Sequence, residues 1–224
     1  GSFDYPFDSV RYMFTFTPPD KRFRLYNWHV DFTDNTFRYY GVIQMRNPDS
    51  LELYPLYDRV EDALLNAQDT VLGREGWYGA QYFKLIQQTI NDKKYYTLLG
   101  WDGFNNTSNR KLIDVLSFDK GGKPRFGAPI FRKDDQTMKR VIWKYNNNAT
   151  MQVEYDAEER VIAFDHLVPP DQDKRGREHT YVPDGTYDYY KFKPEEAVWE
   201  FKKQYFPEDF SPAQDSENTN QDDS

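Results

Sequence analysis

The residues with the clearest chemical potential are Asp165 and His166, which stand side by side in the segment Phe164-Asp165-His166-Leu167. A carboxylate and an imidazole can cooperate in general acid–base catalysis or in metal binding. The segment has the composition of a β-strand, however, and adjacent strand residues point to opposite faces of the sheet. We therefore expect Asp165 and His166 to be a strand-end pair whose side chains do not share one site.

Carboxylates that lie among aromatic residues offer a second possibility, which is the binding or hydrolysis of glycans. Glycoside hydrolysis needs two carboxylates about 5–10 Å apart, flanking the scissile bond. Because the chain has 37 acidic residues, chance neighbours of this kind are expected, and the catalytic residues stay unknown. The candidate carboxylates are Asp102, Asp165, Asp184 and Asp188, and the candidate ligand-binding rings are Trp101, Tyr187, Tyr189 and Tyr190.

Other chemistries lack their sequence signatures. The chain has no cysteine and only three histidines, without metal-ligand spacing, so we predict neither a metal site nor a cofactor. No Gly-x-Ser-x-Gly elbow is present, and Gly121-Gly122-Lys123 lacks the leading glycine of a phosphate-binding loop. The polar run at residues 102–109 resembles a calcium loop, but Ile113 occupies the position that needs an acidic ligand.

The charge and hydropathy of the chain exclude two classes of partner. The net charge is −8, and residues 207–224 hold six acidic and no basic residues, which leaves −2 for the rest. A nearly balanced body lacks the basic surface that nucleic-acid binding requires. The mean hydropathy is −0.94. No apolar run approaches the roughly 18–20 residues that cross a bilayer, so we predict no transmembrane segment.

The sequence pattern predicts that the elements which position these residues are mainly strands. Aromatic residues make up 18% of the chain, and they pack well on pleated surfaces. Short apolar runs separated by turn formers predict an all-β fold, an antiparallel meander, sandwich or barrel, with one short helix near residues 58–68. The predicted strands span residues 10–16, 23–32, 37–45, 77–90, 95–101, 111–118, 125–131, 139–145, 150–155, 160–167, 186–192 and 197–201. A helix over residues 80–90 is the alternative that periodicity leaves open.

The run at residues 23–32 has apolar residues on both of its faces. Phe23, Leu25, Asn27, His29 and Asp31 share one face, and Arg24, Tyr26, Trp28, Val30 and Phe32 share the other. The second set holds more large apolar side chains, so we predict that it faces the core. The polar residues 33–36 then predict a hairpin with residues 37–45.

The domain organisation follows from the same pattern. We expect residues 1–4 to be a lead-in, residues 5–206 to form a single β-rich domain, and residues 207–224 to be a disordered acidic tail. Gly1-Ser2 resembles the remnant of a cleaved purification tag, so we expect that a native signal or anchor segment has been removed.

Several motifs taken together resemble an uncharacterised family of exported proteins of Bacteroidota. They are Trp77-Tyr78-Gly79-Ala80 and the segments YYTLLGWDGFNN (95–106), FGAPIF (126–131), FDHL (164–167) and PDGTYDYYKF (183–192). The resemblance covers roughly residues 20–201 and implies export to the periplasm or the outer membrane, with no established activity. We therefore expect a non-catalytic cell-envelope protein that binds or assembles with other envelope proteins. The alternative is a protein that binds or hydrolyses carbohydrate.

Overall fold

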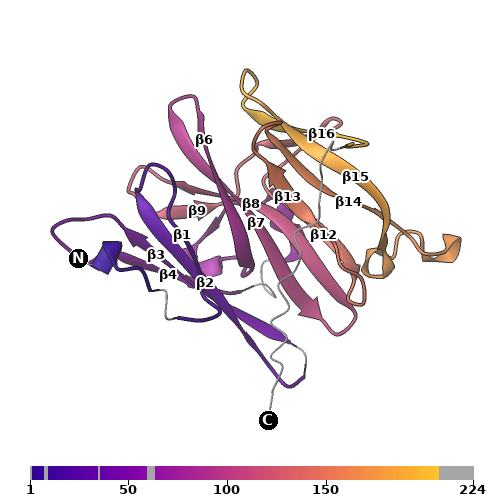
Figure 1. Ribbon diagram of the computed structural model, residues 1–224, viewed down its shortest axis with the longest axis horizontal. Coiled ribbons are helices and arrows are strands. Elements are labelled where there is room, and N and C mark those ends of the chain that lie inside the picture. The colour runs from indigo at the N-terminus through magenta and orange to yellow at the C-terminus, as the bar shows by residue number, and fades with distance from the viewer. Residues whose placement is uncertain (1, 8–9, 35, 60–63, 207–224) are drawn as a thin grey trace, which may run out of the picture.

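The computed structural model describes residues 2–7, 10–34, 36–59 and 64–206, and strands dominate them (Figure 1). The helices within these ranges are short 3₁₀ turns. The predicted all-β fold is confirmed, and its strands form three sheets. The expected acidic tail, at residues 207–224, lies outside the described residues.

The first sheet is an antiparallel unit at the N-terminal end of the chain. Its order is β1-β2-β3-β4, and β2 and β3 form the predicted hairpin. The strands are β1 (Phe14–Phe16), β2 (Phe23–Asp31), β3 (Phe37–Met45) and β4 (Leu53–Tyr57).

The second sheet is central and is built on two long hairpins. Its order is β5-β9-β8-β7-β6, and β12 pairs with the first half of β8. The segment at residues 80–90 is therefore a strand, not the alternative helix. The strands are β5 (Leu72–Gly73), β6 (Gln81–Ile90), β7 (Lys93–Asn105), β8 (Ser108–Phe118), β9 (Pro124–Phe126) and β12 (Val141–Asn146).

The third sheet has the order β11-β10-β16-β15-β14-β13. The pairing of β10 with β16 is parallel, and the other pairs are antiparallel. The strands are β10 (Phe131–Lys133), β11 (Gln136–Met138), β13 (Val153–Asp156), β14 (Val161–Val168), β15 (Val182–Lys193) and β16 (Val198–Lys202).

The central sheet is buried on both faces, which explains the almost continuous apolar runs of β7 and β8. Leu98 and Leu112 belong to a core shared with the N-terminal sheet, whereas Leu99 and Ile113 belong to a core shared with the C-terminal sheet. Figure 1 shows the indigo N-terminal strands and the orange-to-yellow C-terminal strands on opposite sides of the magenta central strands. The fold is thus a three-layered β arrangement.

The prediction of which face of β2 meets the core was wrong. Phe23, Leu25 and Asn27 are completely buried, and Phe23 and Leu25 pack in the core beneath the N-terminal sheet. On the opposite face Val30 is exposed, and so is Phe32, just past the strand end. The inner face tolerates Asn27 because its side-chain oxygen accepts the backbone N–H of Tyr82 at 2.7 Å.

The segment predicted as a helix is only partly described. Residues 60–63 lie outside the described residues, and the helical part that follows is the 3₁₀ segment Leu64–Asp69, interrupted at Asn66. Asp58, at the start of the predicted helix, forms a bridge with Trp77, and its carboxylate accepts the backbone N–H of Tyr39 at 3.0 Å. In the part of the chain that the structure describes, no helix has the length and apolar character to cross a membrane.

Candidate functional site

The structure joins two of the candidate residues that lie far apart in sequence. Nδ1 of His166 on β14 is 2.8 Å from Oδ2 of Asp188 on β15. The imidazole is 40% exposed, whereas the Asp188 side chain is only 9% exposed. The second carboxylate oxygen of Asp188 accepts the backbone N–H of Gln204 at 3.1 Å. Asp188 is therefore fixed by two contacts and holds an accessible imidazole in place.

An irregularity in β15 brings Asp184 into the same region. Asp165 pairs with Tyr187 and Leu167 pairs with Pro183, so three β15 residues lie opposite His166 alone. Residues 184–186 form this bulge, and Gly185 has the φ of +85° that it needs. Burial would raise the pKa of Asp184, but hydrogen bonds from Thr186 and the charge of His166 lower it overall.

Asp165 is tied to the neighbouring strand and not to His166. Its Oδ2 accepts the backbone N–H of Gln152 at 2.7 Å, and its own N–H donates to the carbonyl of Gln152. Burial raises the pKa of Asp165, although the bond from Gln152 opposes the shift. The imidazole of His166 takes Asp188 on the other strand as its partner, although Asp165 and His166 both line the groove described next.

A groove of about 700 Å³ lies in front of His166 and Asp188. One wall is β12, with Trp143 and Lys144, and the short 3₁₀ turn Glu178–Thr180 and its neighbour Tyr181 close one end. The β10–β11 connection, which contains two aspartates, also lines the groove. Small-molecule sites commonly have volumes of about 300–1000 Å³. The groove therefore has the size and the mixed polar and aromatic lining of a ligand site.

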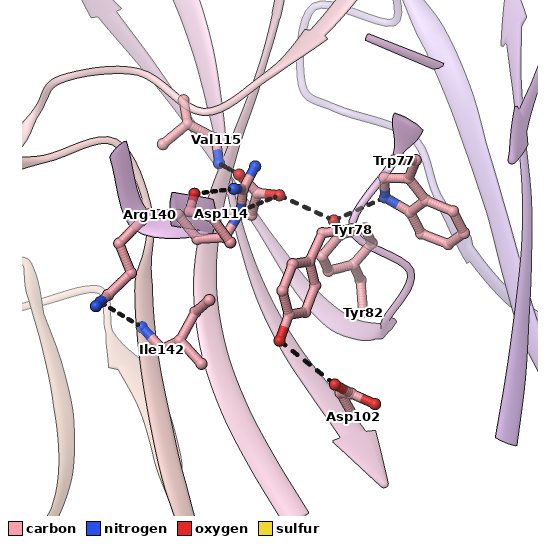
Figure 2. Close-up of polar contacts among 10 residues, drawn as sticks. Trp77, Tyr78, Tyr82, Asp102, Asp114, Val115, Arg140 and Ile142 are labelled. Atoms are coloured by element: carbon pink, nitrogen blue, oxygen red, sulfur yellow. Dashed lines mark hydrogen bonds and ion pairs between the residues drawn. The ribbon is translucent and has the colours of Figure 1, made fainter. Parts of the chain in front are cut away.

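Asp102 and Trp101 lie elsewhere and face different surroundings. Asp102 is buried beside Tyr78, whose hydroxyl donates to it at 3.4 Å (Figure 2). Nη1 of Arg110 lies 3.6 Å from Oδ2 of Asp102. Burial raises the pKa of Asp102 to about 7, and the charge of Arg110 offsets only part of that shift. Trp101 packs against Phe37 and lines a separate cavity of about 570 Å³.

The candidate tyrosines of β15 are divided between different environments. Tyr190 is buried in the core shared with the central sheet, where its ring contacts Phe131 and Phe164. The ring of Tyr189 lies 5.3 Å from that of Tyr205. Burial and the charge of Asp165 raise the pKa of Tyr187. These rings and Trp101 do not form one surface. Among the described residues, no cluster of three or more histidine or acidic side chains could hold a metal ion.

The structure reveals an outer surface that includes Trp28 and Val30, two residues predicted to face the core. The hairpin register sets Trp28 opposite Tyr40, and Tyr40 opposite Tyr57, so three rings cross three strands in one row. The Trp28 and Tyr40 rings are nearly parallel, 12° apart, with centroids at 5.7 Å. These rings belong to a surface that we call the outer face of the N-terminal sheet. It is formed by Trp28, Val30, Tyr40, Val42, Leu53, Pro55 and Tyr57.

Exposure of this face is substantial. The side of β2 to β4 opposite the core leaves Tyr40 38% and Tyr57 47% exposed. Among the described residues, the exposed large apolar side chains all precede residue 58, except Val71 and Phe206. The register of the hairpin, had it been combined with the correct buried face, would have predicted this row.

No family model, curated protein or solved structure matches this chain.

Proposed function

We propose that this chain is a non-catalytic binding protein of the cell envelope, and that it docks another protein onto the outer face of its N-terminal sheet. The observation that carries the proposal is the outer-face row of half-buried Trp28 with exposed Tyr40 and Tyr57. Monomeric proteins seldom expose large contiguous apolar patches, and such patches commonly mark interaction sites.

The composition of this face suits a protein partner. Tryptophan and tyrosine are enriched at the energetic centres of protein interfaces, because they bring a large apolar area and a polar tip. Val42 and Pro55 form the next row across β3 and β4, beside the aromatic row. Arg38, opposite Val30 on β3, supplies a charge at the rim.

The placement in the cell envelope has a different basis. It depends on the resemblance of the sequence motifs to exported proteins of Bacteroidota. The docking face and the location are therefore separate parts of the proposal, and each can fail without the other.

Site-specific photo-cross-linking in cells that make the protein tests the docking face. A benzophenone amino acid at position 57 should yield one discrete adduct with another protein. The same group in place of Phe206, which is 82% exposed at the other end of the described chain, is the matched control and should not yield that adduct.

A second substitution connects the adduct to the aromatic row. Tyr40→Ser, added to the position-57 probe, should reduce the yield of the adduct about tenfold, the effect of losing one interface side chain worth about 1.4 kcal/mol. An unchanged unfolding midpoint would show that the fold is intact, as expected for a surface position. Identical adducts from positions 57 and 206, or no adduct at all, would contradict the docking proposal.

A further inference from the structure

The groove in front of His166 contains an imidazole that is held ready to accept a hydrogen bond. The Asp188 carboxylate accepts a hydrogen bond from Nδ1–H, so the neutral form of the ring carries its lone pair on Nε2. Both oxygens of Asp188 have partners, and its side chain is 9% exposed, so the imidazole has one fixed orientation. In binding sites, a buried polar group commonly holds an exposed one in the orientation that the ligand contact requires.

The bulge in β15 is an independent observation at the same place. Residues 184–186 lie opposite His166 alone, and the bulge places the Asp184 carboxylate close enough to His166 for their charges to interact. Bulges interrupt the ladder at some cost and often re-aim side chains beside functional sites. Here the bulge ends regular pairing where the imidazole meets the groove.

The charges that line the groove argue against an anionic ligand. Carboxylates outnumber ammonium groups among the lining residues, and both lysines already have aromatic partners. Nζ of Lys133 lies 4.5 Å from the Phe201 ring centroid, and Nζ of Lys144 lies 5.2 Å from that of Phe104. Burial and the charge of Arg110 lower the pKa of Lys144.

The remaining lining fits a ligand that is rich in hydroxyl groups. Nε2 of His166 and the carboxylate of Glu178 can accept hydrogen bonds from hydroxyl groups. Half-buried Trp143 and Tyr181 give the groove aromatic walls, against which the C–H faces of a sugar ring can pack.

We propose that the groove between β12 and β14–β15 is a binding site for a neutral oligosaccharide, separate from the docking face and independent of it. His166, oriented by Asp188, and Glu178 accept hydrogen bonds from hydroxyl groups, while Trp143 and Tyr181 contact the ring faces. The site binds the saccharide and is not assigned a reaction.

Ligand-observed NMR tests the site with a defined mixture of neutral hexasaccharides of glucose, mannose, galactose, xylose and N-acetylglucosamine. We expect saturation transfer from the protein to at least one of them, with an affinity about tenfold weaker in His166→Gln and in Glu178→Gln. Glu178 is exposed, and a glutamine amide at position 166 can donate to Asp188 in place of the imidazole, so both variants should keep the wild-type unfolding midpoint. Tyr57→Ser on the docking face and Glu154→Gln in the other cavity are the matched controls and should bind normally.

Three results would overturn the proposal: no saturation transfer to any hexasaccharide, binding unaffected by both groove variants, or preferential binding of a sulfated hexasaccharide used as an anionic competitor. Loss of binding in Tyr57→Ser alone would place the saccharide on the outer face of the N-terminal sheet, and it would also refute the groove as the saccharide site. None of these results alters the cross-linking outcome at position 57, so the two proposals can fail separately.

Discussion

Nε of Arg140 lies 2.9 Å from Oδ2 of Asp114, and both side chains are completely buried. Burial alone would lower the pKa of Arg140, but the Asp114 carboxylate raises it above its ordinary value. Nη1 of Arg140 also donates to the carbonyl of Ala67 at 2.5 Å. The ion pair thus connects β8, the start of β12 and the 3₁₀ segment Leu64–Asp69.

A network extends from this pair to the N-terminal core. Asp114 accepts the hydroxyl of Tyr82 at 3.3 Å, and that hydroxyl accepts the indole N–H of Trp77 at 3.0 Å (Figure 2). Removing one member of a buried pair leaves an uncompensated charge, which costs about 3–5 kcal/mol. We therefore expect Arg140→Met to lower the free energy of unfolding, measured in urea, by roughly this amount.

Two further variants distinguish the loss of charge balance from the loss of packing. The double variant Arg140→Met/Asp114→Leu should recover part of the stability, because it removes both buried charges. Arg74→Met, which breaks the exposed pair with Glu75, should leave the unfolding midpoint nearly unchanged. A double variant less stable than Arg140→Met alone would contradict this account.

The buried carboxyl of Asp102 should make stability fall as pH rises. Its pKa is about 7 in the folded chain, against 3.8 as the ordinary value. Between these values the folded state holds a proton that the unfolded state has lost, so the free energy of unfolding declines from about pH 4 to about pH 7. Above pH 7 this contribution is constant, and its whole extent is at most about 4 kcal/mol at 1.36 kcal/mol per pK unit.

Asp102→Asn isolates this effect from other titrations. The variant keeps a polar side chain beside Tyr78 and Arg110 but cannot ionise. The difference in unfolding free energy between the variant and the wild type should shift in favour of the variant as pH rises from 4 to 7. A difference that is flat over this window, measured by urea unfolding at several pH values, would show that Asp102 ionises normally.

Gly79 occupies a position where no side chain fits. Its φ is +62°, and an added Cβ would lie 2.2 Å from Oδ1 of Asp58. A residue other than glycine costs about 1–2 kcal/mol at a left-handed φ. Gly79→Ala should lower the unfolding free energy by more than this, because Asp58 must also move away from the backbone N–H of Tyr39. Gly76→Ala is the control, since its Cβ would meet nothing within 4 Å. That change should be neutral or stabilising by up to about 1 kcal/mol in thermal unfolding.

Period-two alternation and turn residues carried most of the fold prediction. The hairpin of β2 with β3 lies where the pattern indicated, and the strands predicted at 77–90, 95–101 and 111–118 fall on β6, β7 and β8. The run at 125–131 was less well predicted, because Gly127, with a φ of +95°, separates β9 from β10. Local signals suffice to locate strands, because side chains alternate between the two faces of a strand and this alternation appears in the strand's own sequence.

Contacts between distant strands could not be predicted in this way. His166 and Asp188 were both candidates, but their pairing depends on the β14–β15 register and on a bulge that the sequence presents as an ordinary turn. The buried partners Asp114 and Arg140 carry no local sign that they meet. The spacing of residues in the sequence shows that a strand is present. Which polar side chains meet depends on the register of that strand with its partner strand.

The face of β2 was misjudged because counting apolar residues ignores what covers them. Arg24 and Tyr26 point outward, yet both are buried, since the N-terminal segment lies over them. Nη1 of Arg24 donates to the carbonyls of Phe3 and Tyr5, at 2.8 and 2.5 Å, and the Phe7 ring meets Tyr26 edge-on at 5.6 Å. The N-terminal segment therefore covers one end of the outer sheet surface, and the aromatic row beyond it stays open.

This arrangement predicts that Arg24 holds the N-terminal segment in place. Hydrogen bonds from a charged donor contribute about 1.5–3 kcal/mol, so Arg24→Met should speed amide hydrogen exchange in residues 2–7 at least about tenfold. Exchange in β7 and β8 should stay as in the wild type, because the central sheet does not depend on this contact. Arg22→Met, which removes an exposed guanidinium lying over Phe118, is the matched control and should leave residues 2–7 unchanged. Equal exchange of these residues in all three proteins would mean that the ring contact of Phe7 with Tyr26, and not the guanidinium, keeps the segment on the sheet.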